Sequence, residues 1–178
     1  MLHLLMPDRH FATYRDLSPA FLAEAGVRVL LSDIDNTLAP YEQSEPDEEI
    51  RAWVGAMNAA GITVAFVSNN HADRVELFNR TLGCPAYPDA HKPLKKTVRR
   101  AMCELGSTPE TTAFLGDQLL TDVLAGKGLG MRAYTVPPIR DKRDPFTRFK
   151  RLLERPVFRA YHKRMKKIKQ EVKNHADT

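Results

Sequence analysis

Short apolar segments alternate with helical patterns along most of this chain, and this alternation restricts its fold more than any other feature. The predicted strands are residues 27–33, 62–68, 112–115 and 132–136. The predicted helices are residues 46–60, 72–82, 93–105 and 119–125. Because parallel strands need long crossover connections, this succession predicts an α/β fold, a three-layer α/β/α Rossmann-like arrangement around a parallel sheet.

Polar clusters follow three of the predicted strands directly. They are residues 33–37, 68–70 and 116–122. In an open α/β sheet, ligands bind outside the carboxyl ends of the strands. We therefore expect the three clusters to meet in one crevice.

The first cluster begins with two carboxylates one residue apart, Asp33 and Asp35. Burying two acids at the end of an apolar strand costs free energy unless their charge is compensated, and a divalent cation is the usual compensation. A turn beginning at Ile34 would spread both carboxylates around one centre. This pattern favours a catalytic loop with a metal ion and a nucleophile.

Four motifs occur in order within residues 27–136: DIDNTL, VSNN, HKPLKK and FLGDQLLTD. Together they resemble the four motifs of the haloacid dehalogenase superfamily of phosphotransferases. A lone DxD is common in surface loops, but four ordered motifs, each on the expected element, are specific. The resemblance implies a hydrolase, a phosphatase that works through an aspartyl-phosphate intermediate.

The resemblance also implies roles for particular side chains. Asp33 is the nucleophile, and Asp35 is the general acid and base. Ser68 and Asn69 bind the phosphoryl oxygens, although a serine at this place could also be a helix N-cap. Lys92 neutralises charge on the nucleophile and on the transferring phosphoryl group.

A magnesium site follows from the same resemblance, since oxygen ligands suit Mg²⁺. The implied protein ligands are the side chains of Asp33 and Asp117 and the backbone carbonyl of Asp35. Asp122 is expected to support Asp117 by hydrogen bonding. Thr37 is expected to brace the loop through its hydroxyl.

The spacing of the motifs predicts that no cap domain covers the site. Residues 35–68 leave room for one loop, one helix and one strand, and residues 68–92 for little beyond one helix. An open site can admit a phosphate carried on a large molecule. Within the capless subclass III branch, the motifs resemble the YqeG group, which is related to mitochondrial phosphatidylglycerophosphate phosphatases. The resemblance therefore implies that the substrate is phosphatidylglycerophosphate.

The basic residues gather at the end of the chain. Residues 140–178 hold fourteen Lys and Arg against five Asp and Glu, a charge of +9 in a chain with a net charge of +5. We expect a phosphatase domain at 1–140 and a basic, partly helical extension at 141–178. Its apolar residues from Val157 onward recur at helical spacing. Such a helix could lie on an anionic membrane, pack on the domain or a second subunit, or be disordered beyond about Lys163.

The remaining expectations concern location and partners. No apolar run approaches the roughly 20 residues that span a bilayer, so we expect a cytoplasmic protein, at most peripheral at the inner face of the membrane. Cys84 and Cys103 lack a metal-ligand spacing and are expected to be packing residues. The alternative substrates are nucleic-acid ends and a soluble phosphometabolite, and the alternative class is an RNA- or ribosome-binding module.

Overall fold

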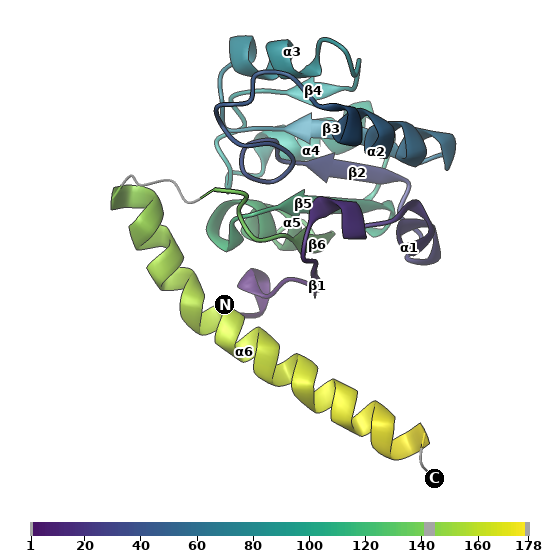
Figure 1. Cartoon of the computed structure of the whole chain (residues 1–178), viewed down its shortest axis with the longest axis vertical. Helices are drawn as coiled ribbons and strands as arrows, with labels where there is room; N and C mark the ends of the chain where they lie inside the picture. Colours follow the sequence, from purple (N-terminus) through teal and green to yellow (C-terminus); the bar gives the residue numbers. More distant parts are fainter. Residues whose placement is uncertain (1, 141–144, 177–178) are drawn as a thin grey trace.

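A parallel six-stranded sheet forms the centre of the computed structural model, which describes residues 2–140 and 145–176. The strand order is β1-β6-β5-β2-β3-β4 (Figure 1). The strands are β1 (Arg9–His10), β2 (Val29–Ser32), β3 (Thr63–Val67), β4 (Ala86–Tyr87), β5 (Thr112–Gly116) and β6 (Arg132–Thr135). The predicted α/β class with a parallel sheet is confirmed.

Helices cover both faces of the sheet. One face packs against α1 (Pro19–Glu24), α2 (Glu48–Ala59) and α3 (Ala72–Asn79). The other face packs against α4 (Lys96–Glu104) and α5 (Leu124–Lys127). In β2, Leu30 belongs to the first core and Leu31 to the second, because successive strand side chains point to opposite faces. Such two-sided burial explains why the strands are apolar without alternation.

Short helical segments complete the fold. They are η1 (Leu2–Leu5), η2 (Tyr14–Asp16), η3 (Pro109–Thr111) and η4 (Leu119–Val123), the last a π-helical turn that runs directly into α5. Helix starts follow local capping chemistry: the Asp47 carboxylate accepts a hydrogen bond from the Ile50 N–H at 2.9 Å. For this reason α2 begins at Glu48, two residues after the predicted start at Pro46.

Two predictions about local structure need correction. The helix expected from Pro93 begins at Lys96 instead, because the Leu94 N–H donates to the His91 carbonyl in a preceding turn. Leu94, expected on the apolar face of that helix, is 64% exposed. The sequence patterns also missed β1, β4 and α1, which are too short to show a clear periodicity.

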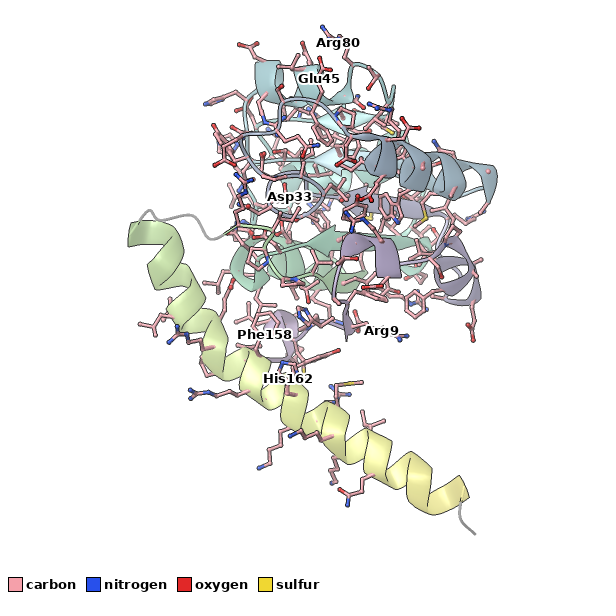
Figure 2. All side chains as sticks on the ribbon, in the orientation of Figure 1. Arg9, Asp33, Glu45, Arg80, Phe158 and His162 are labelled. Atoms are coloured by element: carbon pink, nitrogen blue, oxygen red, sulfur yellow. The ribbon has the colours of Figure 1, made fainter. Side chains whose placement is uncertain are left out.

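The C-terminal helix α6 (Pro145–Ala176) crosses the β1 edge of the molecule and then extends beyond it (Figure 1). Val157 packs with Leu119 and Val123, and the Tyr161 hydroxyl accepts a hydrogen bond from the His10 N–H at 2.9 Å. Phe158 and His162 lie where the helix meets the body (Figure 2). The first half of the apolar stripe therefore packs on the domain, while Ile168 is exposed. In the described ranges no helix is both long and apolar enough to cross a bilayer.

Candidate active site

The predicted clusters do meet at the carboxyl edge of the sheet. The strands that precede them, β5, β2 and β3, are neighbours in the sheet. An open cleft of about 300 Å³ lies above their ends, lined by Asp33, Asp35, Tyr41, Ser68, Asn69, Asn70, Lys92, Gln118 and Thr121. Most of the residues singled out in the sequence thus line one cleft.

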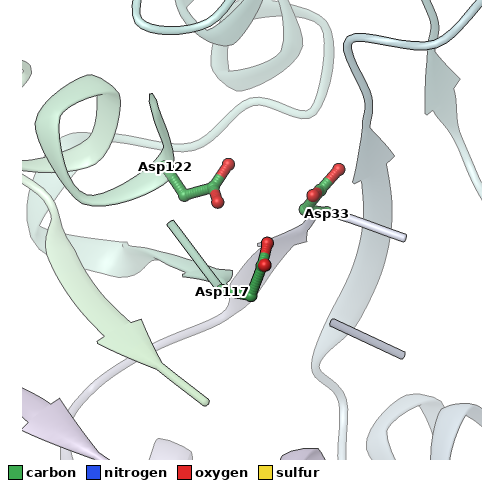
Figure 3. Close-up of side chains that lie close together, drawn as sticks. All are labelled: Asp33, Asp117 and Asp122. Atoms are coloured by element: carbon green, nitrogen blue, oxygen red, sulfur yellow. The ribbon is translucent and has the colours of Figure 1, made fainter. Parts of the chain in front are cut away.

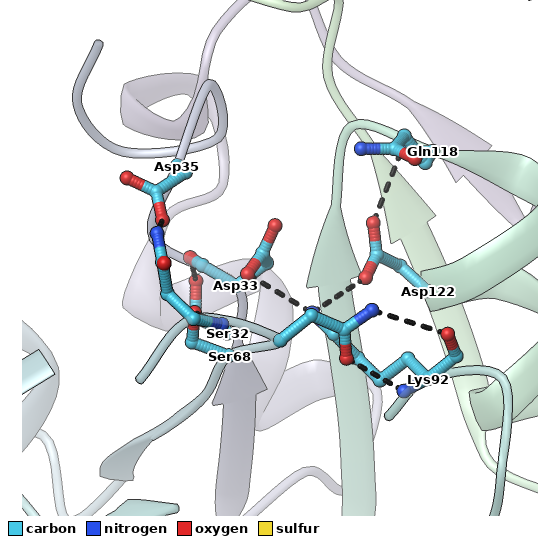
Figure 4. Close-up of polar contacts among 9 residues, drawn as sticks. Ser32, Asp33, Asp35, Ser68, Lys92, Gln118 and Asp122 are labelled. Atoms are coloured by element: carbon cyan, nitrogen blue, oxygen red, sulfur yellow. Dashed lines mark hydrogen bonds and ion pairs between the residues drawn. The ribbon is translucent and has the colours of Figure 1, made fainter. Parts of the chain in front are cut away.

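Three buried carboxylates form one cluster, the carboxylate floor, and Asp33 of this cluster also lines the cleft. Asp33, Asp117 and Asp122 each offer an oxygen atom within 4.8 Å of the others (Figure 3). The ammonium of Lys92 lies 2.9 Å from Asp33 Oδ1 and 2.8 Å from Asp122 Oδ1 (Figure 4). Three buried carboxylates near one lysine leave an excess of negative charge, and oxygen donors so close together fit a hard divalent cation. The residues present are therefore suited to a divalent metal ion.

The acids and the lysine change each other's protonation. Burial raises the pKa of Asp33 to about 6, against the lowering effect of Lys92 and with a further rise from Asp122. Burial alone would lower the pKa of Lys92, but the nearby carboxylates of Asp122 and Asp33 raise it above its usual value. Lys92 is thus held as a cation, whereas burial favours the protonated form of Asp33.

A tight turn follows Asp33 and contains Asp35, the second acid of the first motif. The Leu38 N–H donates to the Ile34 carbonyl at 2.9 Å, and Asn36 adopts a φ of 63°, a left-handed conformation that asparagine tolerates. The predicted bracing by the Thr37 hydroxyl is wrong: this atom is buried without a hydrogen-bond partner in the structure. The backbone N–H of Thr37 donates to Ile34 instead, so the main chain holds the turn.

The turn directs Asp35 away from the carboxylate floor and toward α3. Its Oδ2 accepts a hydrogen bond from Asn70 at 2.9 Å, and its Oδ1 lies 3.0 Å from the Arg74 guanidinium. Sequence reasoning did not find Arg74, because nothing marks one arginine inside a helix as the partner of an acid 39 positions earlier. The predicted metal contact through the Asp35 carbonyl stays a prediction.

Asn69 holds the backbone of Lys92. Its side-chain amide donates to the Lys92 carbonyl at 3.1 Å and accepts from the Lys92 N–H at 2.6 Å. Ser68 Oγ accepts a hydrogen bond from the Asn70 N–H at 3.0 Å. Ser68 is not the N-cap of α3, a place taken by His71. Both side chains still line the cleft, so their predicted phosphate contacts stay predictions.

The last motif depends on a glycine. A Cβ atom on Gly116 would lie 2.3 Å from the Asp122 carboxyl carbon, so only glycine lets this carboxylate approach the end of β5. Asp122 Oδ2 also accepts a hydrogen bond from the Gln118 N–H at 3.0 Å. The turn between Asp117 and Asp122 is thus closed by Asp122 itself, and the expected hydrogen bonding of Asp122 to Asp117 stays a prediction.

These features define a class of protein. Residues 8–130 match the family model of haloacid dehalogenase-like hydrolases, and the chain belongs to that family. It is an enzyme of the phosphatase type. The chain is 35% identical over 155 residues to "Probable phosphatase YqeG" of Bacillus subtilis (strain 168), an alignment that covers 87% of this chain and 90% of that protein.

Solved structures share the fold at low sequence identity. An uncharacterised protein from Listeria monocytogenes serotype 4b superposes with a TM-score of 0.53 at 14% identity, covering 67% of this chain and 85% of that one. The cobalt-bound deoxy-D-mannose-octulosonate 8-phosphate phosphatase (YrbI) of Haemophilus influenzae gives a TM-score of 0.50 at 18% identity, covering 62% and 69%. At these identities the likeness shows the fold alone.

Proposed function

We propose that this enzyme hydrolyses phosphomonoesters through an aspartyl phosphate on Asp33, with Mg²⁺ as cofactor. The observation that carries the proposal is the pairing of a buried Asp33 with Lys92 at 2.9 Å, at the floor of an open cleft. A carboxylate so placed can attack phosphorus while the lysine offsets the charge of the phosphoryl group. Asp117 and Asp122 complete the charge balance around it.

The reaction then has two steps. A carboxylate oxygen of Asp33 attacks phosphorus, the bond from phosphorus to the alcohol oxygen breaks, and Asp35 gives a proton to that oxygen. Asp35 next takes a proton from water, whose oxygen attacks phosphorus and displaces Asp33 to release phosphate. Asn70 and Arg74 hold the Asp35 carboxylate in place for both transfers. Ser68 and Asn69 line the cleft, and they are proposed to bind the phosphoryl oxygens.

The cation would be held by the carboxylates of Asp33 and Asp117 and by the Asp35 carbonyl. Its chemistry is to neutralise charge on the nucleophile and the phosphoryl oxygens. Asp122 is proposed to support the site without binding the cation, by fixing Lys92 and the backbone at Gln118.

Asp33→Asn tests the mechanism on a simple aryl phosphate. We expect kcat to fall by about 1,000-fold or more, because an amide cannot form the phosphoenzyme. Asp73→Asn makes the same chemical change at an exposed position on α3 and should keep full activity. When the reaction is quenched with acid, the Asp35→Asn variant should carry a covalent phosphate that hydroxylamine removes. The Asp33→Asn variant should carry no such phosphate. Full activity of Asp33→Asn would disprove the mechanism.

We further propose that the substrate is a membrane lipid phosphate, phosphatidylglycerophosphate, as the resemblance to the YqeG group implies. The support in the structure is the rim of the site. Tyr41 lines the cleft and is 47% exposed, and Ile139 after β6 is 44% exposed. Apolar side chains around an open site favour a substrate embedded in a bilayer.

The basic extension supplies attraction to such a surface. The cations Arg155, Arg159, Lys163 and Arg164 of α6 are exposed. Each cation near an anionic membrane contributes about 1 kcal/mol. We propose residues 1–140 as the phosphatase domain and residues 141–178 as an extension that contacts the membrane peripherally.

A substrate panel separates the alternatives. Phosphate release is measured from anionic vesicles that contain phosphatidylglycerophosphate, from 3′-phosphorylated oligonucleotides and from sugar phosphates, with and without Mg²⁺. We expect the highest kcat/KM on the vesicles, and a loss of this preference at high salt, which screens the basic helix. Higher kcat/KM on oligonucleotides or sugar phosphates would overturn the lipid assignment but leave the aspartyl-phosphate mechanism standing.

A further inference from the structure

The carboxylate of Glu154 on α6 is buried against the active-site turn. The residue is 4% exposed, and its Oε1 accepts hydrogen bonds from the Leu119 N–H at 2.7 Å and the Leu120 N–H at 3.1 Å. Such N–H groups open a helix and have no partner within it. They also form its positive end, where a carboxylate is stabilised. A side chain from the C-terminal helix therefore caps η4.

The capped turn joins the two acids of the last motif. Three successive N–H groups follow Asp117, and each is bonded to a carboxylate: Gln118 to Asp122, and the next two to Glu154. Asp117 precedes this turn and Asp122 lies within it. Glu154 therefore restrains the backbone on which both acids are mounted.

The position of Glu154 is fixed by the docking of α6. Val157, one turn further along, is buried against Leu119 and Val123 of the same η4 segment. The Tyr161 hydroxyl bonds to the His10 N–H at the sheet edge. Glu154 lies outside residues 8–130, the part of the chain that matches the family model. The support for the site thus comes from a segment beyond that match.

We propose that Glu154 is a positioning residue that sets the affinity of the Asp33–Asp117 site for a divalent cation by fixing the turn from Asp117 to Asp122. The inference rests on the proposed metal site. Removing the carboxylate leaves two backbone N–H groups buried without their acceptor, and the turn must shift or admit water to satisfy them. The acids it carries then lose their alignment.

The direct test measures the binding of Mn²⁺ to the full chain at a temperature well below unfolding. The electron paramagnetic resonance signal of the free ion reports how much Mn²⁺ is unbound. We expect Glu154→Ala to weaken binding about tenfold, the lower end of the loss seen when a group supporting a metal ligand is removed. Glu154→Gln should bind within about twofold of the wild type, because its amide oxygen can accept the same two hydrogen bonds. Leu153→Ala, an exposed neighbour on α6, should bind like the wild type.

Each outcome decides the proposal. Equal Mn²⁺ affinity of wild type and Glu154→Ala would overturn it, as would a Glu154→Gln variant as weak as Glu154→Ala. If Glu154→Ala does not fold, Glu154→Asp replaces it: a carboxylate one methylene shorter should bind at intermediate strength, and wild-type affinity would overturn the inference. A wild type that binds no Mn²⁺ would overturn the metal site itself, a result distinct from equal binding by both proteins.

Discussion

At the scale of single residues, the site depends on close approaches that leave no spare volume. Gly116 brings the end of β5 against the Asp122 carboxylate, and Lys92 lies between two acids at hydrogen-bond distance. Buried charges in such contact tolerate little displacement, because a moved partner leaves the other charge uncompensated. Small substitutions here should therefore have large effects.

Gly116→Ala tests this tightness. We expect phosphatase activity to fall at least about 100-fold, since the added Cβ would displace Asp122 from Lys92 and a 1 Å misplacement can cost that much. The matched control is Gly55→Ala on α2, where a Cβ meets nothing within 4 Å. That change should keep activity and raise stability by about 0.5–1 kcal/mol. Unchanged activity of Gly116→Ala would contradict the geometry.

The two cysteines should differ in reactivity. Burial raises the pKa of the Cys84 thiol to about 11, whereas Cys103 is exposed, which corrects the prediction that both are packing residues. Because the thiolate is the nucleophile, a thiol reagent at pH 8 should label Cys103 rapidly and Cys84 only after unfolding. Peptide mapping of the labelled protein reads this out, and rapid labelling of Cys84 in native protein would refute it.

At the scale of elements, α6 docks against the β1 edge of the sheet. His10 of β1 is central to this contact: its ring bonds to Thr135 and contacts Phe158, Tyr161 and His162 of the helix. Burial, and next the proximity of His162, lower the pKa of His10 below its usual 6.5. Protonation of the ring therefore opposes the docking of α6.

This pKa shift gives α6 docking a pH dependence. The folded pKa lies below the unfolded value, so the contribution of His10 is complete above about pH 6.5 and is lost as the pH falls through that value toward the folded pKa. We expect faster amide exchange over residues 152–168 at pH 5.5 than at pH 7.5, after correction for intrinsic rates. His10→Asn should flatten this difference. Equal protection at both pH values in the wild type would disprove the link.

At the scale of the whole molecule, the charges divide between a catalytic body and a basic end. The body buries Asp33, Asp117 and Asp122 around Lys92, and this cluster opposes folding unless a cation binds. A ligand that binds only the folded state stabilises it by mass action. The stability of the whole fold should therefore depend on whether a cation is bound at the site.

Mg²⁺ should raise the midpoint of thermal unfolding, and more so at higher pH. The folded, metal-free pKa of Asp33, about 6, exceeds its ordinary value of 3.8, so this group costs stability above pH 6 and the cost disappears as pH falls toward 4. Protons also compete with the cation below pH 6. The Mg²⁺-induced shift should shrink between pH 7.5 and pH 5, and Asp117→Asn should abolish it. A shift independent of pH would refute the assignment.

The sequence by itself determined β2, β3, β5 and β6, the order of the motifs and the place where the motif side chains gather. Apolar runs identify buried strands, and a parallel sheet puts their carboxyl ends at one edge, so Asp33, Ser68 and Asp117 converge whatever the details. Short-range chemistry also makes Asp47 the N-cap of α2, so the helix begins at Glu48, two residues after the predicted start. These features depend on neighbours along the chain or on one topological rule.

Only the tertiary structure decided which distant side chains support the site. Arg74 bonds to Asp35, Glu154 caps the turn after Asp117, and the Thr37 hydroxyl has no hydrogen-bond partner in the structure, contrary to expectation. It also decided that α6 packs on the rest of the fold through Glu154, Val157 and Tyr161. Such contacts depend on where separate elements dock. The hydrophobic periodicity of a single segment does not indicate which other segment it will pack against.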